Sequence, residues 1–366
     1  SIQFIESERI FQLNAGDSTL ILRIADEGYL LSLYYGKALP FGSPFHGAFD
    51  GYDFRDYAAS FSPRNAHVQD GSFSPDVAPL AYSGFGTGDF RKSAVALRNH
   101  WGNDATDFRY VSHKIYVGKP RLAGLPATYA DENEADTLEI LLHDSTTAAE
   151  LTLVYTAFRN EPVITQSVRL ANSSEDALDI EKLYSASVSL NDMDYDLCHL
   201  YGRWGAERNL ERTTLRHGQQ SISSSRGSSS HYHNPFVSLV RHGATEDFGE
   251  VYGFNLVYSG SFDMTVDCDY YETTRLLAGI NPDGFTWRLE AGETFQTPEL
   301  VMVYTDAGVG EMSRIFHRLY REHLIRGRWK TEKRPLLINS WEAAFFNFDT
   351  DKLVNFAEHA REIGIE

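Results

Sequence analysis

Apolar and polar residues alternate along most of the chain, from residue 1 to about residue 305. Alternation over four to eight residues is typical of β-strands with one buried face, because successive side chains point to opposite faces of a sheet. The alternating runs are rich in β-branched and aromatic residues and are separated by turns; examples are 137–142, 151–158, 164–170 and 251–258. This pattern predicts a mainly β fold, with long antiparallel sheets packed face to face over residues 1–305.

One irregular stretch, roughly residues 41–106, interrupts the alternation and mixes aromatic residues with Gly, Asp and Pro. Loops of this length inside a compact domain are uncommon and often functional. Two interpretations stay open at this point. The stretch is either a surface excursion packed by its own aromatic residues or a functional loop.

The spacing of apolar residues changes after Tyr304. Apolar residues then recur every three or four positions, which places them on one stripe of a helix. Gly327, flanked by two arginines, fits the C-terminal end of such a helix. We therefore predict a linker helix within residues 306–333, with a stripe formed by Met312, Ile315, Phe316, Leu319, Tyr320 and Leu324.

The last segment, residues 334–366, has the pattern of a strand followed by a helix. The apolar run 335–339 fits a strand that is buried on both faces. Asp349 or Thr350 can cap a helix that ends at Gly364. Its inward side would carry Leu353, Phe356, Ala357, Ala360 and Ile363. A (β/α)₈ barrel needs about 250 residues, so we predict the first βα unit of a barrel that is cut short.

Charge and composition exclude several classes of partner. Lys and Arg total 33 against 51 Asp and Glu, which gives a formal charge of −18 and repels the phosphates of nucleic acids. No run approaches the roughly 18 apolar residues of a membrane helix, so we expect neither a nucleic-acid nor a membrane partner.

The two cysteines, Cys198 and Cys268, fit a reducing compartment, and we expect a cytoplasmic location. Because the chain starts at Ser1, a removed signal peptide stays an open alternative.

The sequence lacks complete motifs for cofactors and metals. No G-x-G-x-x-G follows a strand, and neither a P-loop nor a G-x-S-x-G elbow occurs, so nucleotide cofactors and serine hydrolase chemistry are not expected. Asp192, Asp194 and Asp196 have the spacing of a calcium loop, but Leu197 and Arg203 stand where Gly and Glu are required. We interpret these aspartates as an exposed acidic turn.

The serine-rich stretch 221–236 can be read as a flexible linker. It contains His231 and His233, which would share one face of a strand. A third ligand at useful spacing is missing, which argues against a metal site. We therefore predict neither a metal nor a cofactor for this chain.

Two tryptophans are candidates for binding a sugar. Trp204, in YGRWGAERN, is either a plug of the core or an apolar platform edged by charged groups. Trp341 follows the predicted strand 335–339, and residues at the C-terminal ends of barrel strands point into active sites. Its neighbour Glu342 is a candidate general acid, but glycoside hydrolysis needs two carboxylates and no second one can be placed.

At this point several sequence blocks resemble the α-galactosidases of glycoside hydrolase family 36, particularly the bacterial type. The blocks run in the family's order over essentially the whole chain. They are LYYGKALP, GTGDFR, GKPRLAGLPATY, SSRGSSSHYHNPF, GEVYGFNLVYSG, GINPDGFTWRLEAGETFQTPELVMVYTDAG and RPLLINSWEAAFFNFDTDKLVNFAEHAREIGIE.

The resemblance implies a fold and an activity. The fold would be an N-terminal β-supersandwich of two large antiparallel sheets, a linker helix, a catalytic (β/α)₈ barrel and a C-terminal β domain. Family members release terminal α-1,6-linked galactose from melibiose and raffinose-type oligosaccharides with retention, using two aspartates. The K-W-D-x-N block that carries the nucleophile does not occur here, so the resemblance assigns no catalytic residue to this chain.

The resemblance also implies residues that contact substrate. Trp341, in an N-x-W-E-A block, resembles a tryptophan of the first barrel strand that lines the sugar site. Trp204, in a G-x-W-G-x-E-R block, resembles one contributed by the β domain. Asp56 resembles an aspartate that a neighbouring subunit contributes in bacterial tetramers, which implies a homo-oligomer formed through the N-terminal domain.

Two alternatives to an α-galactosidase stay open on the sequence. One is a non-catalytic carbohydrate-binding or oligomerisation module. The other is a relative that acts on α-N-acetylgalactosaminides, which the loops of the barrel would decide.

Overall fold

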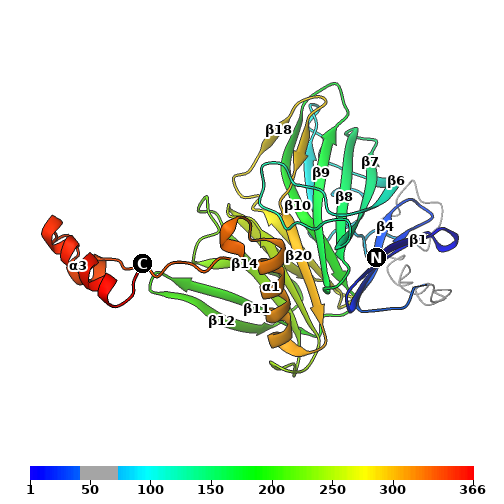
Figure 1. Cartoon of the computed structure of the whole chain (residues 1–366). Coiled ribbons are helices and arrows are strands. Elements are labelled where there is room, and N and C mark those ends of the chain that lie inside the picture. Colours follow the sequence, from blue (N-terminus) through cyan, green and yellow to red (C-terminus); the bar gives the residue numbers. More distant parts are fainter. Residues whose placement is uncertain (42–72) are drawn as a thin grey trace. The chain divides into compact units, whose positions relative to one another are not determined.

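The computed structural model describes residues 1–41 and 73–366 (Figure 1). These residues form two compact units, Ser1–Arg318 and Leu319–Glu366. Strands dominate the first unit, as the alternating pattern predicts, and helices dominate the second. The candidate contact Asp56 and much of the irregular stretch 41–106 lie outside the described residues.

The strands of the described residues form three antiparallel sheets. The ten-stranded sheet has the order β12-β11-β14-β15-β20-β9-β8-β7-β6, with β19 beside β9; the six-stranded sheet has the order β13-β16-β17-β10-β18, with β5 beside β10; the four-stranded sheet has the order β1-β2-β3-β4. The two large sheets are the predicted ones, and the small sheet is an addition to them.

The bounds of the strands come close to the predicted runs. The ten-stranded sheet contains β6 (Phe108–Val117), β7 (Ala135–Asp144), β8 (Ala149–Phe158), β9 (Val163–Asn172), β11 (Tyr195–Arg203), β12 (Ala206–Thr214), β14 (His233–Arg241), β15 (Val251–Val257), β19 (Thr294–Gln296) and β20 (Glu299–Thr305). The others are β1 (Ile2–Ile5), β2 (Ile10–Ala15), β3 (Ser18–Ile24), β4 (Leu30–Lys37), β5 (Val95–Arg98), β10 (Leu178–Leu190), β13 (Gly218–Ser224), β16 (Phe262–Cys268), β17 (Thr274–Ile280) and β18 (Trp287–Leu289), and a 3₁₀ turn, Glu6–Glu8, follows β1.

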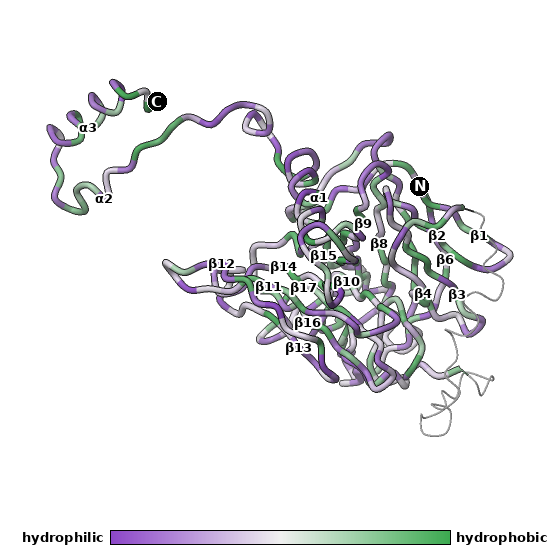
Figure 2. The backbone as a smooth tube through the Cα atoms, turned by 90° about the horizontal axis from the view of Figure 1, so that it is seen from below, coloured by the Kyte–Doolittle hydropathy of each residue, from purple (hydrophilic) through white to green (hydrophobic). Residues whose placement is uncertain are grey.

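One continuous apolar core joins the facing sides of the sheets. Hydrophobic and hydrophilic residues alternate along many strands, as Figure 2 shows. In β16 and β20, however, every residue is buried, including the polar ones that alternation assigns to solvent. For β16 the reason is that residues 73–94 cover its outer face with a hydrogen-bonded polar layer.

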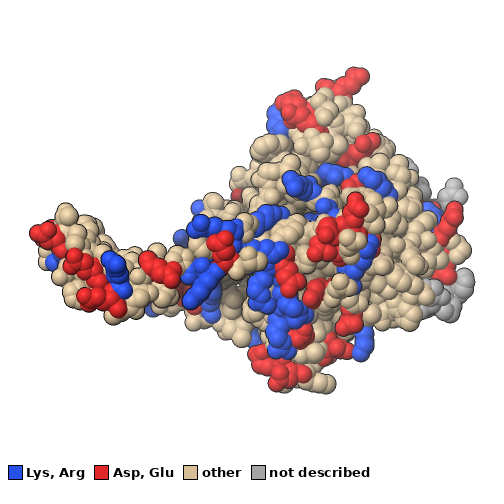
Figure 3. Space-filling view, in the orientation of Figure 1, with Lys and Arg blue, Asp and Glu red and all other residues tan. Residues whose placement is uncertain are grey.

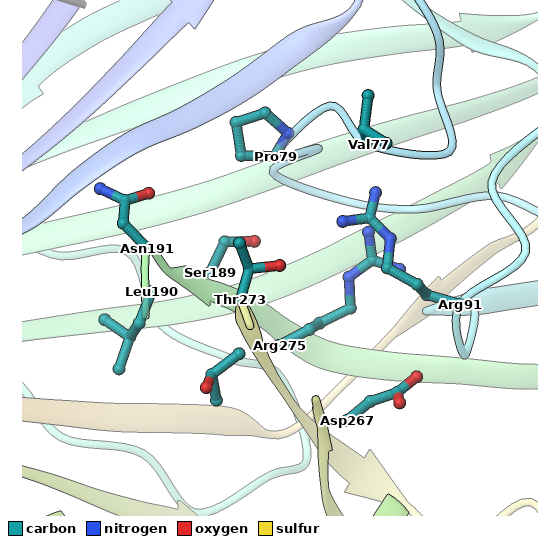
Figure 4. A pocket seen from close by; sticks show the side chains of 10 residues that line it. Val77, Pro79, Arg91, Ser189, Leu190, Asn191, Asp267, Thr273 and Arg275 are labelled. Atoms are coloured by element: carbon teal, nitrogen blue, oxygen red, sulfur yellow. The ribbon is translucent and has the colours of Figure 1, made fainter. Parts of the chain in front are cut away.

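This polar layer is built by the GTGDFR block, residues 86–91. The Arg275 guanidinium donates to Asp89 Oδ2 over 2.6 Å, and Arg91 Nε donates to Asp89 Oδ1 over 2.9 Å. The Lys92 backbone N–H donates to Asp267 Oδ2 over 2.9 Å. Figure 4 shows the guanidinium groups of Arg91 and Arg275 beside each other under the segment of Val77 and Pro79. The block therefore fastens residues 73–94 to the six-stranded sheet.

Helix α1 (Gly308–His323) packs on the ten-stranded sheet, within the range predicted for the linker helix. Its residues Met312, Ile315 and Phe316 are buried. Helix α1 can lie close to the sheet because Gly253 of β15 has no side chain. A Cβ at Gly253 would lie 2.6 Å from Phe316 and 2.7 Å from the Met312 sulfur. The ring of Phe316 also meets Phe236 of β14 edge to face, with 5.4 Å between centroids.

The second unit contains a 3₁₀ turn (Arg328–Lys330), α2 (Trp341–Ala344) and α3 (Thr350–Glu362). Asp349 caps α3 as predicted, because its carboxylate accepts from the Lys352 N–H over 2.8 Å. The expected strand at 335–339 is not formed, and no strand among the described residues pairs with it. A single strand cannot satisfy its backbone groups without a ladder partner. The predicted inward side of α3 is likewise largely exposed, except for buried Ala360.

The serine-rich stretch 221–236 is not a flexible linker. It contains the end of β13, the connection 225–232 and the start of β14. The Ser224 hydroxyl donates to the Ser228 carbonyl over 2.6 Å, and the Ser229 N–H donates to the Ser259 carbonyl over 2.9 Å. Serine serves here as a turn former through local side-chain to backbone bonds, which composition does not distinguish from a linker.

Acidic and basic side chains are interspersed on the face that carries α1 (Figure 3). Many are paired; Arg318 of α1, for example, donates to Glu161 over 3.0 Å and to Glu311 over 3.2 Å. No helix in the described parts of the chain has both the length and the apolar composition needed to cross a membrane.

Candidate functional site

The hairpin of β11 and β12 forms one end of the ten-stranded sheet and carries Trp204 at its turn. The Trp204 side chain is 84% exposed. The interpretation of Trp204 as a plug of the core is therefore wrong. An exposed indole offers a flat apolar surface of the kind that stacks against the C–H face of a sugar ring.

Backbone geometry explains why glycines surround Trp204. Gly205 has a φ of +74°, a left-handed conformation that glycine adopts without steric cost. A Cβ at Gly202 would lie 2.5 Å from both the Ala206 carbonyl oxygen and the Glu207 Cα. Both strands can therefore approach closely at the turn, and the indole is held at its tip.

Charged and amide side chains hold this turn. The Gly205 N–H donates to Glu207 Oε1 over 2.9 Å, and this backbone hydrogen bond lowers the pKa of Glu207. The Arg203 guanidinium donates to the Trp204 carbonyl over 3.4 Å. The Asn209 amide donates to the Ala206 carbonyl over 2.8 Å. The backbone at Trp204 and Gly205 is thus bonded to one guanidinium and one carboxylate, groups that can also bond sugar hydroxyls.

An aromatic residue outside the hairpin also supports the turn. The Gly202 N–H donates to the carbonyl of Tyr232, which lies just before β14. The Tyr232 ring is exposed and lies 5.8 Å from the Arg226 guanidinium. No sequence pattern predicted a role for Tyr232. Its signal was an aromatic residue between the two histidines of the serine-rich stretch.

The DMDYD aspartates anchor the root of the hairpin rather than a cation. Asp196 accepts from Arg212 Nε over 2.6 Å and from the Thr214 hydroxyl over 3.0 Å. Burial favours the neutral acid, yet the bonds from Arg212 and Thr214 bring the pKa of Asp196 below its usual value. Asp192 is held in the same way by Arg241, at 2.5 Å. Among the described residues no group of three His, Cys, Asp or Glu is arranged to hold a metal.

Two histidine rings from neighbouring strands meet edge to face. His199 of β11 and His233 of β14 have centroids 5.4 Å apart. Burial lowers the pKa of both rings, and for His233 the neighbouring His199 lowers it further. His231 and His233 do not share one face of a strand as expected, because His231 lies in the turn before β14. The actual neighbour of His233 comes from a different strand.

A pocket of about 360 Å³ lies beside the hairpin. Its apolar lining includes Leu200 and Leu210 of the hairpin together with Phe236 of β14 and Met312 of α1. Arg212, Glu246 and His199 add polar groups. The hairpin therefore has an aromatic tip and an apolar flank.

The second unit holds the other candidate, Trp341, at the first position of α2. The Trp341 N–H donates to Asn339 Oδ1 over 2.7 Å, so Asn339 forms a local turn immediately before the helix. The indole is 45% exposed and meets Phe345 and Phe346 edge to face, at 5.4 Å and 4.9 Å. Glu342 is exposed, and its carboxylate makes no hydrogen bond or ion pair with the described residues.

Sequence comparison identifies the family of this chain. Residues 28–290 match the glycosyl hydrolase family 36 N-terminal domain, and residues 294–366 match Melibiase. The chain belongs to glycoside hydrolase family 36. The large antiparallel sheets match those of a family 36 N-terminal region.

Known family 36 proteins resemble the chain over its whole length. It is 45% identical to alpha-galactosidase AgaA of Geobacillus stearothermophilus and 38% identical to alpha-galactosidase Mel36A of Lactobacillus acidophilus, covering 100% of this chain and 49% of each relative. The crystal structure of AgaB from G. stearothermophilus superposes with a TM-score of 0.94 at 44% identity, covering 100% of this chain and 49% of that one. The chain thus spans about half the length of the relatives it matches.

Proposed function

We propose that the whole protein to which this family 36 chain belongs is an α-galactosidase. It would hydrolyse terminal α-1,6-galactosyl residues of melibiose and raffinose-type oligosaccharides with retention of configuration. The observation that carries the proposal is the match to named α-galactosidases along the full chain, at 45% identity for AgaA. Crystal structures of AgaA variants in complex with raffinose and with stachyose support oligosaccharides as the substrate class.

We infer that the chemistry follows a two-aspartate mechanism, with both aspartates outside these 366 residues. In a retaining glycosidase one carboxylate attacks the anomeric carbon while the other protonates the leaving oxygen, about 5–5.5 Å away. Residues 334–366 would then be the first βα unit of the catalytic barrel. The uncovered apolar residues at 336–338 and on α3 support this assignment, because barrel units bury such residues against their neighbours.

The chain's own share of this function is substrate contact. Trp204 would stack on the sugar, with Arg203 and Glu207 beside it, and Trp341 would line the pocket. Asp56 would reach the site of a neighbouring subunit in a homotetramer in the cytoplasm. Exposure of the Trp204 indole on a turn that several hydrogen bonds hold is the support for its role.

The test compares the full-length protein with the 366-residue chain on p-nitrophenyl α-galactopyranoside and raffinose. We expect hydrolysis by the full-length protein and none by the chain alone. Hydrolysis by the chain alone would contradict the placement of the aspartates. A full-length protein that binds raffinose without cleaving it would instead establish a carbohydrate-binding module, and exclusive cleavage of α-N-acetylgalactosaminides would establish the related specificity.

A further inference from the structure

Two lysines converge on one aromatic ring at the six-stranded sheet. Lys182 of β10 is half-buried, and its Nζ lies 6.0 Å from the centroid of the Tyr184 ring. Lys92, from the segment that covers this sheet, places its Nζ 5.6 Å from the same centroid. Two cationic groups therefore share one small environment.

The carboxylate of this environment is engaged elsewhere. Asp263 Oδ2 accepts from Lys92 Nζ over 3.2 Å and from the Thr265 hydroxyl over 3.0 Å, and it also accepts from the Tyr184 hydroxyl. The ammonium group of Lys182 makes no hydrogen bond or ion pair within the described parts of the chain, although its backbone pairs with β5. Lys92 is thus neutralised by a partner, and Lys182 is not.

This arrangement disfavours the charged form of Lys182. Burial and the neighbouring Lys92 lower the pKa of Lys182 to about 8, and the attraction of Asp263 offsets only part of the effect. Asp283, which acts on Tyr184, is the other acidic group of this environment. Glu181, the residue before Lys182 on β10, pairs with Arg98; Arg98 Nε lies 2.7 Å from Glu181 Oε1. A large fraction of Lys182 is therefore a neutral amine near pH 8.

We propose that Lys182 is a site of covalent N-acylation by activated acyl donors, such as acyl phosphates and acid anhydrides. The Nζ lone pair attacks the acyl carbon, and an N–C bond forms. The C–O bond to the phosphate or carboxylate leaving group breaks, and that group takes the electron pair. The proton lost from the nitrogen passes to water.

Acylation is more favourable at Lys182 than at an ordinary surface lysine. The amide is neutral, so acylation removes the repulsion between the two cations and leaves the Lys92–Asp263 pair balanced. Lys37 lacks this advantage. Lys37 is paired with Asp306 at 2.7 Å, and this hydrogen bond raises the pKa of Lys37.

The experiment treats the folded chain with limiting acetic anhydride or acetyl phosphate between pH 6 and 10 and quantifies acetylated peptides by mass spectrometry. At pH 7.5 we expect Lys182 to react about tenfold faster than Lys37, because a pKa near 8 leaves far more neutral amine. Its rate should level off above pH 8, whereas that of Lys37 should keep rising.

The variant Lys92→Met removes the like charge and frees Asp263, so acetylation of Lys182 at pH 7.5 should slow several-fold. The matched control Lys114→Met, on the ten-stranded sheet, should leave it unchanged. Equal rates at Lys182 and Lys37 in the wild-type chain would overturn the proposal, and this comparison needs no variant to fold. An unchanged Lys182 rate in a folded Lys92→Met chain would overturn it too.

Discussion

Arg275 and Asp89 form a buried ion pair that joins residues 73–94 to the six-stranded sheet. Arg275 Nη2 lies 2.6 Å from Asp89 Oδ2, and the two side chains are 2% and 3% exposed. Arg91 donates to the other oxygen of the same carboxylate over 2.9 Å. Burial alone would raise the pKa of Asp89, but the two guanidinium groups bring it below its usual value. The GTGDFR block is therefore a structural fastening.

Removing the negative charge of Asp89 is expected to lower the free energy of unfolding. Asp89→Asn leaves Arg275 buried without its counterion, which typically costs about 3–5 kcal/mol. Urea unfolding monitored by circular dichroism measures the loss. The control Asp26→Asn changes an aspartate that is 97% exposed, and it should cost little. Equal stabilities of the two variants would show that the buried pair contributes nothing.

The histidine pair predicts a loss of stability on mild acidification. Burial lowers the folded pKa of His199 and His233, so the unfolded chain binds protons first as the pH falls. Stability is therefore full above the unfolded value of about 6.5 and decreases below it. The double variant His199→Gln, His233→Gln should flatten the dependence of the unfolding free energy between pH 7 and 5. A slope equal to that of the wild type would contradict this account.

Trp204→Ala should leave stability unchanged, because the indole is 84% exposed. In the full-length protein, loss of this contact should cost about 1–3 kcal/mol of transition-state binding. This loss lowers kcat/KM for raffinose roughly 5- to 150-fold. The matched control Trp101→Ala removes another exposed indole, on the segment between β5 and β6, and should not change kcat/KM. If both variants lose activity equally, the hairpin has no special role in binding substrate.

Gly253→Ala should loosen α1 from the sheet. The new methyl group would lie 2.6 Å from Phe316 and 2.7 Å from the Met312 sulfur, and such overpacking typically costs about 1–3 kcal/mol. Thermal unfolding measures the cost. The combination with Met312→Ala, which opens space for the methyl group, should recover part of it. Additive losses in the double variant would argue against direct contact.

The local pattern of residues was enough to predict most elements of this protein. Strand runs such as 137–142 and 164–170 lie inside β7 and β9, and the stripe from Met312 to Tyr320 lies on α1, which ends one residue before Leu324. Asp349 caps α3 because capping needs only neighbouring residues. The predicted elements differ from the structure where one local pattern is compatible with two conformations. Serines 223–225 form the end of β13 and the start of a hydrogen-bonded connection rather than a flexible linker. The apolar run 335–339 forms no strand because no described strand pairs with it.

Long-range partners decided the rest of the structure. The sequence by itself determined the β architecture, the helix α1 and the family, because alternation, helical spacing and ordered motif blocks are local properties of the chain. Only the tertiary structure showed that Trp204 faces solvent, that Asp89 meets Arg275 and that Lys182 lies beside Lys92. The two charged pairs join residues far apart in the chain, and a buried or charged environment exists only after the sheets have packed.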